Sequence, residues 1–189
     1  RAANFEFGET SALTIRSGAR LETTVASGLS FATGATMLVT GTGSRINSAG
    51  ALSFGGNSVR GGDLIIEDNA IVTSAANTDS GLGFDSGRNM IVRSGGQFNL
   101  TGGTGAGLQM ENSALLVDNA SVTMGGGFLL GSRFGNNIVT LLNANLTAGS
   151  ITARGSSVVN VGGTRTGAAG AVGIFNVANV SLVRLDNGN

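Results

Sequence analysis

Carboxylates are the side chains of this sequence with the clearest potential for catalysis. Paired carboxylates can act as general acid and general base on a glycosidic bond, and clustered ones can hold calcium against an acidic sugar. Elimination on such a sugar also needs a strong base, for which the sequence offers only arginine, and no second cluster of arginine with carboxylates marks a groove. We therefore expect no catalytic residue, and a polysaccharide-processing enzyme ranks third among the functions considered below. The carboxylates concerned are Glu67, Asp68, Asp79, Asp85 and Asp118.

Several residue types that build catalytic and metal sites are missing from the chain. It has no His, Cys, Lys, Tyr, Trp or Pro, which excludes Ser/His/Asp and Cys/His triads, Schiff-base lysines, and zinc, haem and iron–sulfur sites. The glycine-rich segment 102–107 lacks the Lys of a phosphate loop, and Gly107 stands where a calcium-binding glycine repeat needs Asp. We expect this segment to form a turn, and we expect no cofactor and no bound metal.

Composition favours a folded chain without a nucleic-acid partner. The 189 residues suit one domain, and they include 33 Gly, 41% hydrophobic residues and only 12% charged residues. Eleven Arg balance 11 Asp and Glu, and they are spread singly, whereas phosphate binding needs clustered positive charge. Because no apolar run reaches about 18 residues, we expect no transmembrane segment.

Short aliphatic runs repeat along the whole sequence and must position any functional side chain. They begin 20 to 27 residues apart, about 24 on average, and small or polar residues that tolerate a left-handed backbone follow most of them, as in Ser17–Gly18, Asp68–Asn69 and Asp118–Asn119. The runs are Leu13–Ile15, Met37–Val39, Leu64–Ile66, Met90–Val92, Leu115–Val117, Ile138–Leu141, Val158–Val161 and Val180–Val183.

Two further apolar patterns follow each run. One apolar residue comes directly after the turn, with polar neighbours typical of a half-buried strand. A third group then precedes the next run, as in Leu29–Phe31, Leu52–Phe54 and Leu108–Met110. A unit of this size cannot bury its apolar residues alone, but stacked units form a continuous core. The sequence therefore predicts an all-β, single-stranded parallel β-helix with three strands per coil and about eight coils of about 24 residues, which form a single β-solenoid domain over residues 1–189.

Stacking predicts two ladders of side chains. An inward core ladder would contain one residue from each of four successive coils, and an outward charge ladder would alternate in sign just after the first strand of three coils. We interpret both as structural, since an exposed ion pair contributes only about 0 to 1 kcal/mol. The core ladder is Phe31, Phe54, Phe84 and Met110, and the charge ladder is Glu67, Arg93 and Asp118.

The repeats resemble those of a known group of secreted proteins. Segments 64–73 (LIIEDNAIVT) and 115–125 (LLVDNASVTMG) are similar to passenger-domain repeats of bacterial autotransporters, a pattern shared with filamentous haemagglutinin-like adhesins and other secreted β-solenoids. The resemblance covers nearly the whole chain. It implies a right-handed helix, export through a Gram-negative envelope, an extracellular or cell-surface location, and a role as stalk or adhesin. No catalytic motif of the group is matched, so it assigns no site residue.

Both ends of the chain have the pattern of a strand without a polar or helical cover. An exposed strand edge is a template for another chain. We therefore expect either a piece of a longer passenger or a complete mature subunit that stacks on its own copies. The candidate assembly ends are Phe5 and Phe7 near the first residue and Val180, Leu182 and Val183 near the last.

Two functions of different kinds follow. The favoured one is a non-enzymatic surface stalk or adhesin whose loops bind other surface proteins or glycans, with candidate loops at 75–85, 131–137 and 162–170. The alternative is a self-assembling subunit that stacks head to tail into an extracellular filament. The first rests on the repeat pattern of the whole chain, whereas the second rests on the two ends.

Overall fold

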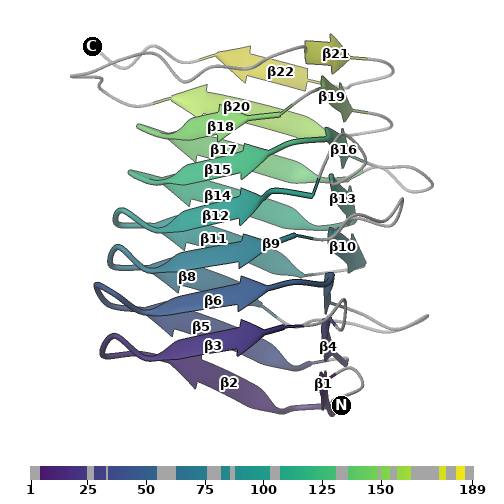
Figure 1. The fold of residues 1–189 in the computed structure, drawn as a ribbon. Coiled ribbons are helices and arrows are strands. Elements are labelled where there is room, and N and C mark those ends of the chain that lie inside the picture. The colour runs from purple at the N-terminus through teal and green to yellow at the C-terminus, as the bar shows by residue number, and fades with distance from the viewer. Residues whose placement is uncertain are drawn as a thin grey trace.

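Short parallel strands form the described part of the chain, which contains no helix (Figure 1). These strands confirm the prediction of an all-β parallel solenoid. The computed structural model describes residues 5–24, 28–32, 34–54, 63–75, 82–85, 88–102, 107–130, 136–148, 150–153, 157–162, 175–177 and 182–185.

Among these residues the strands belong to three parallel sheets, which we name A, B and C. Sheet A has the order β1(Phe5–Phe7), β4(Leu29–Phe31), β7(Leu52–Phe54), β10(Leu82–Asp85), β13(Leu108–Glu111), β16(Gly127–Leu130), β19(Ser150–Ala153), β21(Phe175–Val177). Sheet B has the order β2(Ala12–Ile15), β5(Thr36–Thr40), β8(Leu64–Glu67), β11(Asn89–Arg93), β14(Ala114–Asp118), β17(Ile138–Leu142), β20(Val158–Gly162), β22(Leu182–Leu185). Sheet C has the order β3(Arg20–Thr23), β6(Arg45–Ser48), β9(Ile71–Ser74), β12(Gln97–Leu100), β15(Ser121–Met124), β18(Asn145–Thr147).

Neighbouring strands within a sheet come from neighbouring repeats. Leu13 pairs with Met37, and Leu115 pairs with Val139, so these partners lie 24 residues apart in the sequence. In Figure 1 the strands stack from β1, β2 and β3 at one end to β21 and β22 at the other. The hydrogen bonds between strands therefore run along the axis of the stack.

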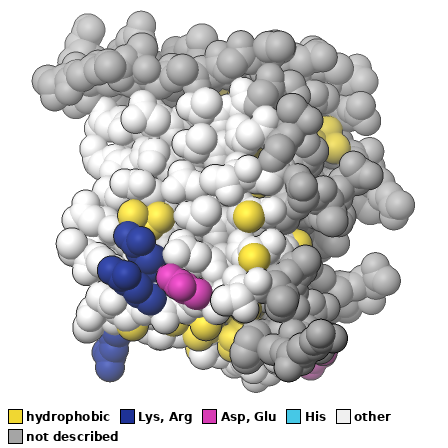
Figure 2. Space-filling view, in the orientation of Figure 1, with side chains coloured by type: hydrophobic (Ala, Val, Ile, Leu, Met, Phe, Trp, Pro, Cys, Tyr) yellow, Lys and Arg dark blue, Asp and Glu magenta, His cyan; other side chains and the backbone are white. Residues whose placement is uncertain are grey.

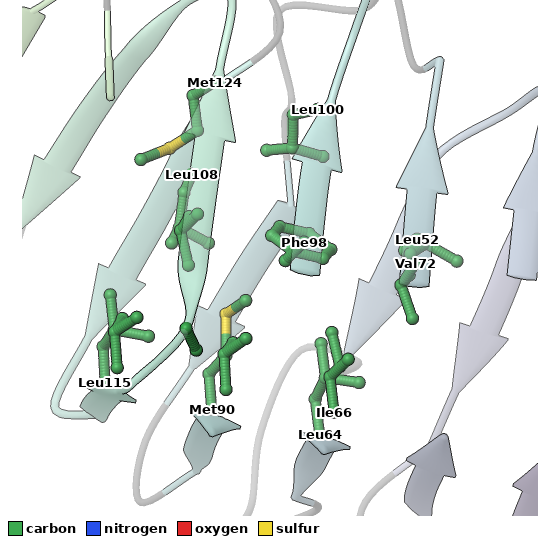
Figure 3. Packing of buried hydrophobic residues seen from close by; sticks show 14 of the residues in the cluster. Leu52, Leu64, Ile66, Val72, Met90, Phe98, Leu100, Leu108, Leu115 and Met124 are labelled. Atoms are coloured by element: carbon green, nitrogen blue, oxygen red, sulfur yellow. The ribbon is translucent and has the colours of Figure 1, made fainter. Parts of the chain in front are cut away.

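Alternation along each strand separates an interior from an outer surface. In β5 the side chains of Met37 and Val39 are fully buried, whereas Leu38 between them is only half-buried. Inward residues of the three sheets share one interior, where Leu64, Met90 and Leu115 of sheet B lie in a row (Figure 3). The apolar residue after each turn also forms one column, in the order Leu21, Ile46, Val72, Phe98, Val122 and Leu146.

The corners between sheets B and C use left-handed backbone at the small and polar residues that the sequence indicated. Ser17, Asp68 and Asn69 have φ of 57°, 55° and 62°, and Asn119 and Asn143 each have φ of 47°. Asn, Asp and Gly accept this conformation more readily than other residues do. A regular turn at each corner keeps the following strand in register with its neighbour.

Three strands differ in detail from the prediction. The predicted runs that begin at Ile138 and Val158 each start one residue too early to align with Leu115, because Leu115 pairs with Val139 and Val139 pairs with Val159. Ile138 faces outward with 49% exposure. The final strand of sheet B is Leu182–Leu185 rather than Val180–Val183. All three runs consist largely of aliphatic residues, so their sequence alone leaves the inward face ambiguous.

Candidate functional surface

The residues of the predicted core ladder are register partners in sheet A. Phe31 pairs with Phe54, Phe54 with Phe84, and Phe84 with Met110. The Phe31 and Met110 side chains are fully buried, while the placement of the Phe54 and Phe84 side chains lies outside the description. The column extends beyond the predicted members, since Phe7 pairs with Phe31 and Met110 with Leu130. The described side chains of Phe31, Met110 and Leu130 are therefore part of the buried core.

The predicted charge ladder lies on the outer side of sheet B. Arg93 Nη2 lies 2.6 Å from Glu67 Oε2, and Arg93 Nε donates a hydrogen bond of 2.7 Å to the same oxygen. Arg93 is also the register partner of Asp118, but Asp118 accepts its 2.8 Å hydrogen bond from the neighbouring Asn119 amide. The structure thus joins Glu67 to Arg93 through an ion pair and places Asp118 beside them in register.

Other carboxylates, within sheet C or directly beside strand β8 of sheet B, also contact the adjacent repeat. Asp63 Oδ1 accepts two hydrogen bonds of 3.1 Å from Asn89, one from its backbone N–H and one from its side-chain amide. Asp68 accepts from the Thr40 hydroxyl at 3.0 Å, and Glu22 accepts from the Asn47 amide at 3.4 Å. These carboxylates hold neighbouring strands together rather than converging on one point.

No group of three or more acidic side chains that could hold a metal ion occurs in the part of the chain that the structure describes. Asp79, one of the five carboxylates considered for catalysis, lies outside the described residues, as does the side chain of Asp85. The remaining three, Glu67, Asp68 and Asp118, have the separate partners given above. Their arrangement brings no pair of carboxylates together across a groove.

A column of buried polar side chains at the corner between sheets A and B was missed by the sequence reasoning. The Asn137 Oδ1 atom accepts from the Ser113 backbone N–H at 3.1 Å, and the Asn137 amide donates to the Ser157 hydroxyl at 3.2 Å. Arg88 occupies the same corner position one repeat before Ser113, because the following residues Asn89 and Ala114 are register partners. All four side chains are buried. A usable signal existed, since each is the polar residue directly before a strand of sheet B.

The outer face of sheet C is mostly uncharged. Figure 2 shows one group of basic side chains beside an acidic one, near the end of the molecule that carries β3, and few charged side chains elsewhere on that face. In this region Arg20 of β3 and Arg45 of β6 are register partners, with Glu22 two residues after Arg20. Arg20 and Arg45 are like charges at adjacent register positions and repel each other, unlike the oppositely charged Glu67 and Arg93.

The candidate assembly ends lie in the terminal strands of two sheets. Phe5 and Phe7 belong to β1, and Leu182 and Val183 belong to β22, where they pair with Val158 and Val159. Val180 lies outside the described residues. Of the candidate loops, 76–81, 131–135 and 163–170 are also outside them, while Leu82–Asp85, at the end of the first loop, forms strand β10.

The described residues contain no helix that is long and apolar enough to cross a membrane. Comparison of the chain with family models, curated proteins and solved structures finds no match.

Proposed function

We propose that this chain is a non-enzymatic structural module of the bacterial cell surface, which acts as a stalk or adhesin and presents its loops to other surface proteins or glycans. In this proposal the chain forms a right-handed β-helix of about eight coils with three strands each. The proposal also includes export to the extracellular side of a Gram-negative envelope.

The observation that carries this proposal is the use of the outer polar side chains. Glu67 bonds to Arg93, Asp63 to Asn89, and Asp68 to Thr40, each between residues 26 to 28 positions apart in the sequence. A surface whose carboxylates bond to the next repeat is suited to rigidity along the stack. The buried apolar columns supply the same rigidity from inside.

The adhesive part of the proposal is tested by replacing residues 76–81 with a Gly/Ser sequence of equal length. This segment is chosen so that Leu82–Asp85, which forms β10, stays intact. Binding to intact Gram-negative cells and to an immobilised glycan panel should fall, while the far-UV circular dichroism stays that of a β protein. The same replacement at 163–170 tests a second of the candidate loops. Unchanged binding by both variants would remove these loops from the adhesive role.

A second candidate function is head-to-tail assembly into an extracellular filament. One observation favours it: in the described part of the chain β1, β2 and β3 each have a hydrogen-bonded neighbour on one side only. Such edges can pair with the strands at the opposite end of another copy. Negative-stain electron microscopy across a concentration series should then show filaments of constant width. Val183→Lys should shorten them to single rods, and filaments that persist in this variant would exclude the proposed junction.

The third function, polysaccharide processing, is tested directly. The purified chain is incubated with calcium and a panel of acidic and neutral polysaccharides. We expect no release of unsaturated or reducing sugar ends, and release above that of a heat-denatured sample would contradict the non-enzymatic proposal.

A further inference from the structure

An apolar column runs along the outer face of sheet B. Its members are the middle outward residues of six successive strands, and consecutive members are register partners. The four aliphatic members are half-buried although they point away from the core, and Ile138, exposed at 49%, lies on the same face. The interior does not require aliphatic side chains here, since Met37 and Val39 on either side of Leu38 already fill it. The column consists of Thr14, Leu38, Ile65, Ile91, Leu116 and Thr140.

Over these six strands the order of residue types is the same in both directions: Thr, Leu, Ile, Ile, Leu, Thr. The register column continues beyond them into β20 with the polar Asn160, the partner of Thr140. The midpoint of the six lies between β8 and β11, which are neighbouring strands. Consider two copies whose sheet B faces lie against each other, related by a two-fold axis that runs parallel to the strands, between the two faces and over this midpoint. The rotation keeps the direction of the strands and reverses the direction of stacking. The operation sets Ile65 against Ile91 of the second copy, and Leu38 against Leu116. A closed two-fold interface requires a self-complementary patch of this kind.

The charged residues beside the column obey the same symmetry. Glu67 and Arg93 follow Ile65 and Ile91 by two residues in β8 and β11, so they lie on the same side of the column. The two-fold operation places Glu67 opposite Arg93 of the second copy, and Arg93 opposite its Glu67. Because the Arg93 side chain is 50% exposed and that of Glu67 is 17% exposed, both can reach a partner. On the other side of the column, Asp63 would face the neutral side chain of Asn89.

We propose that two copies of this chain pair through the outer face of sheet B, with their stacking axes antiparallel. Six strands at about 4.8 Å spacing and about 16 Å of strand length give roughly 500 Å² per copy, or about 1,000 Å² in the pair. That area is at the lower limit for a specific interface, so a reversible dimer in the micromolar range is expected. This pairing goes beyond the proposed function and is independent of the ends of the chain.

Sedimentation velocity of the purified chain from about 1 to 300 µM is the first test. The wild type should pass from monomer to dimer without larger species. Ile91→Arg should remove the dimer in this range, because it places a charge opposite Ile65 of the second copy. Thr123→Arg makes a similar change at an exposed outward position of sheet C and should leave the dimer unchanged. A monomeric wild type, or equal dimerisation of both variants, would overturn the pairing.

A charge-swapped variant, Glu67→Arg with Arg93→Glu, tests the geometry even if Ile91→Arg fails to fold. The swap preserves opposite charges at positions 67 and 93 within one chain and between two swapped copies. The swapped chain should therefore dimerise with itself. In a mixed dimer, however, Glu67 of the wild type would face the glutamate introduced at position 93, and Arg93 of the wild type would face the arginine introduced at position 67, so like charges would meet at both places. Fluorescently labelled wild type should capture the swapped chain at least about tenfold more weakly than it captures itself. Equal capture would overturn the antiparallel pairing. Open-ended growth that Ile91→Arg leaves intact would also overturn it and would favour stacking at the ends.

Discussion

The rings of Phe7 and Phe31 stack almost parallel, with centroids 4.6 Å apart and planes inclined by 5°. The two residues are register partners in β1 and β4, so their contact reproduces in side chains the spacing that the sheet imposes on the backbone. A ladder of this kind ties the packing of each repeat to the repeat before it.

Phe31→Ala should destabilise the chain by about 3 to 5 kcal/mol, because it removes a fully buried ring and leaves a cavity between neighbouring repeats. Denaturant unfolding followed by circular dichroism measures the change. Ser30→Ala, at the adjacent half-buried position of the same strand, is the matched control and should cost well under about 1 kcal/mol. Equal losses in the two variants would contradict the inward placement of the ladder.

Gly107→Ala should weaken the stack because no space exists for a methyl group. A Cβ atom at Gly107 would lie 2.1 Å from the backbone oxygen of Gly127 in the next repeat, so β13 and β16 would have to separate. At Gly8 the nearest atom to such a Cβ is 3.8 Å away, which makes Gly8→Ala the control. Thermal unfolding should show a fall of several degrees for Gly107→Ala only. If Gly107→Ala unfolds at the same midpoint temperature as the wild type, the close approach of the Gly107 and Gly127 backbones would be contradicted.

Asn137→Ala should cost about 1 to 3 kcal/mol, since it removes the Oδ1 atom that accepts from the Ser113 backbone N–H and the amide that donates to the Ser157 hydroxyl, both in a buried corner. The free energy of unfolding from denaturant titration is the measurement. Asn99→Ala, on the outer side of sheet C, removes the same chemical group from a half-buried position and should be close to neutral. The proposed role of the corner column fails if the two substitutions have the same effect.

The ion pair between Glu67 and Arg93 should contribute little to the stability of a single chain. A double-mutant cycle of Glu67→Gln and Arg93→Gln should give a coupling of at most about 1 kcal/mol, because Arg93 is half exposed and solvent screens the pair. The coupling should decrease when salt is raised to about 1 M. The cycle is measured at low micromolar concentration or below, so that pairing between copies does not contribute. A coupling well above about 2 kcal/mol that salt leaves unchanged would contradict this assignment.

The sequence predicted the parallel solenoid because its signal repeats many times: an aliphatic run, a turn and a second apolar position recur about every 24 residues. The sequence does not define which residues of a strand face inward where the aliphatic run has apolar residues on both faces of the strand. At Ile138 to Leu142 two of the outward positions are aliphatic as well, and pairing with β14, together with the corner contact of Asn137, accompanies the inward placement of Val139 and Leu141. Local pattern carries no information about that contact.

The charged residues were harder to assign than the core. The repeat places Glu67, Arg93 and Asp118 at equivalent positions of successive strands, with charges that alternate in sign. The choice of hydrogen-bond partner depends on side-chain rotamers, and Asp118 bonds to the adjacent Asn119 instead of to Arg93. Arg88 is 2% exposed, although an arginine in a sequence is normally read as a surface residue. Its burial follows from its place in the corner column, which becomes evident only when the repeats are superposed.

The direction of the hydrogen bonds described above has a mechanical consequence. Because they run along the stacking axis, a force that pulls the two ends apart loads them in tension, one strand neighbour after another, rather than shearing a whole sheet at once. Each repeat contacts its immediate neighbours, so yielding should proceed repeat by repeat from an end. Every repeat released would lengthen the molecule by about 80 Å of extended chain. A surface stalk with this property would extend in steps under a pulling force while the remaining repeats stay folded.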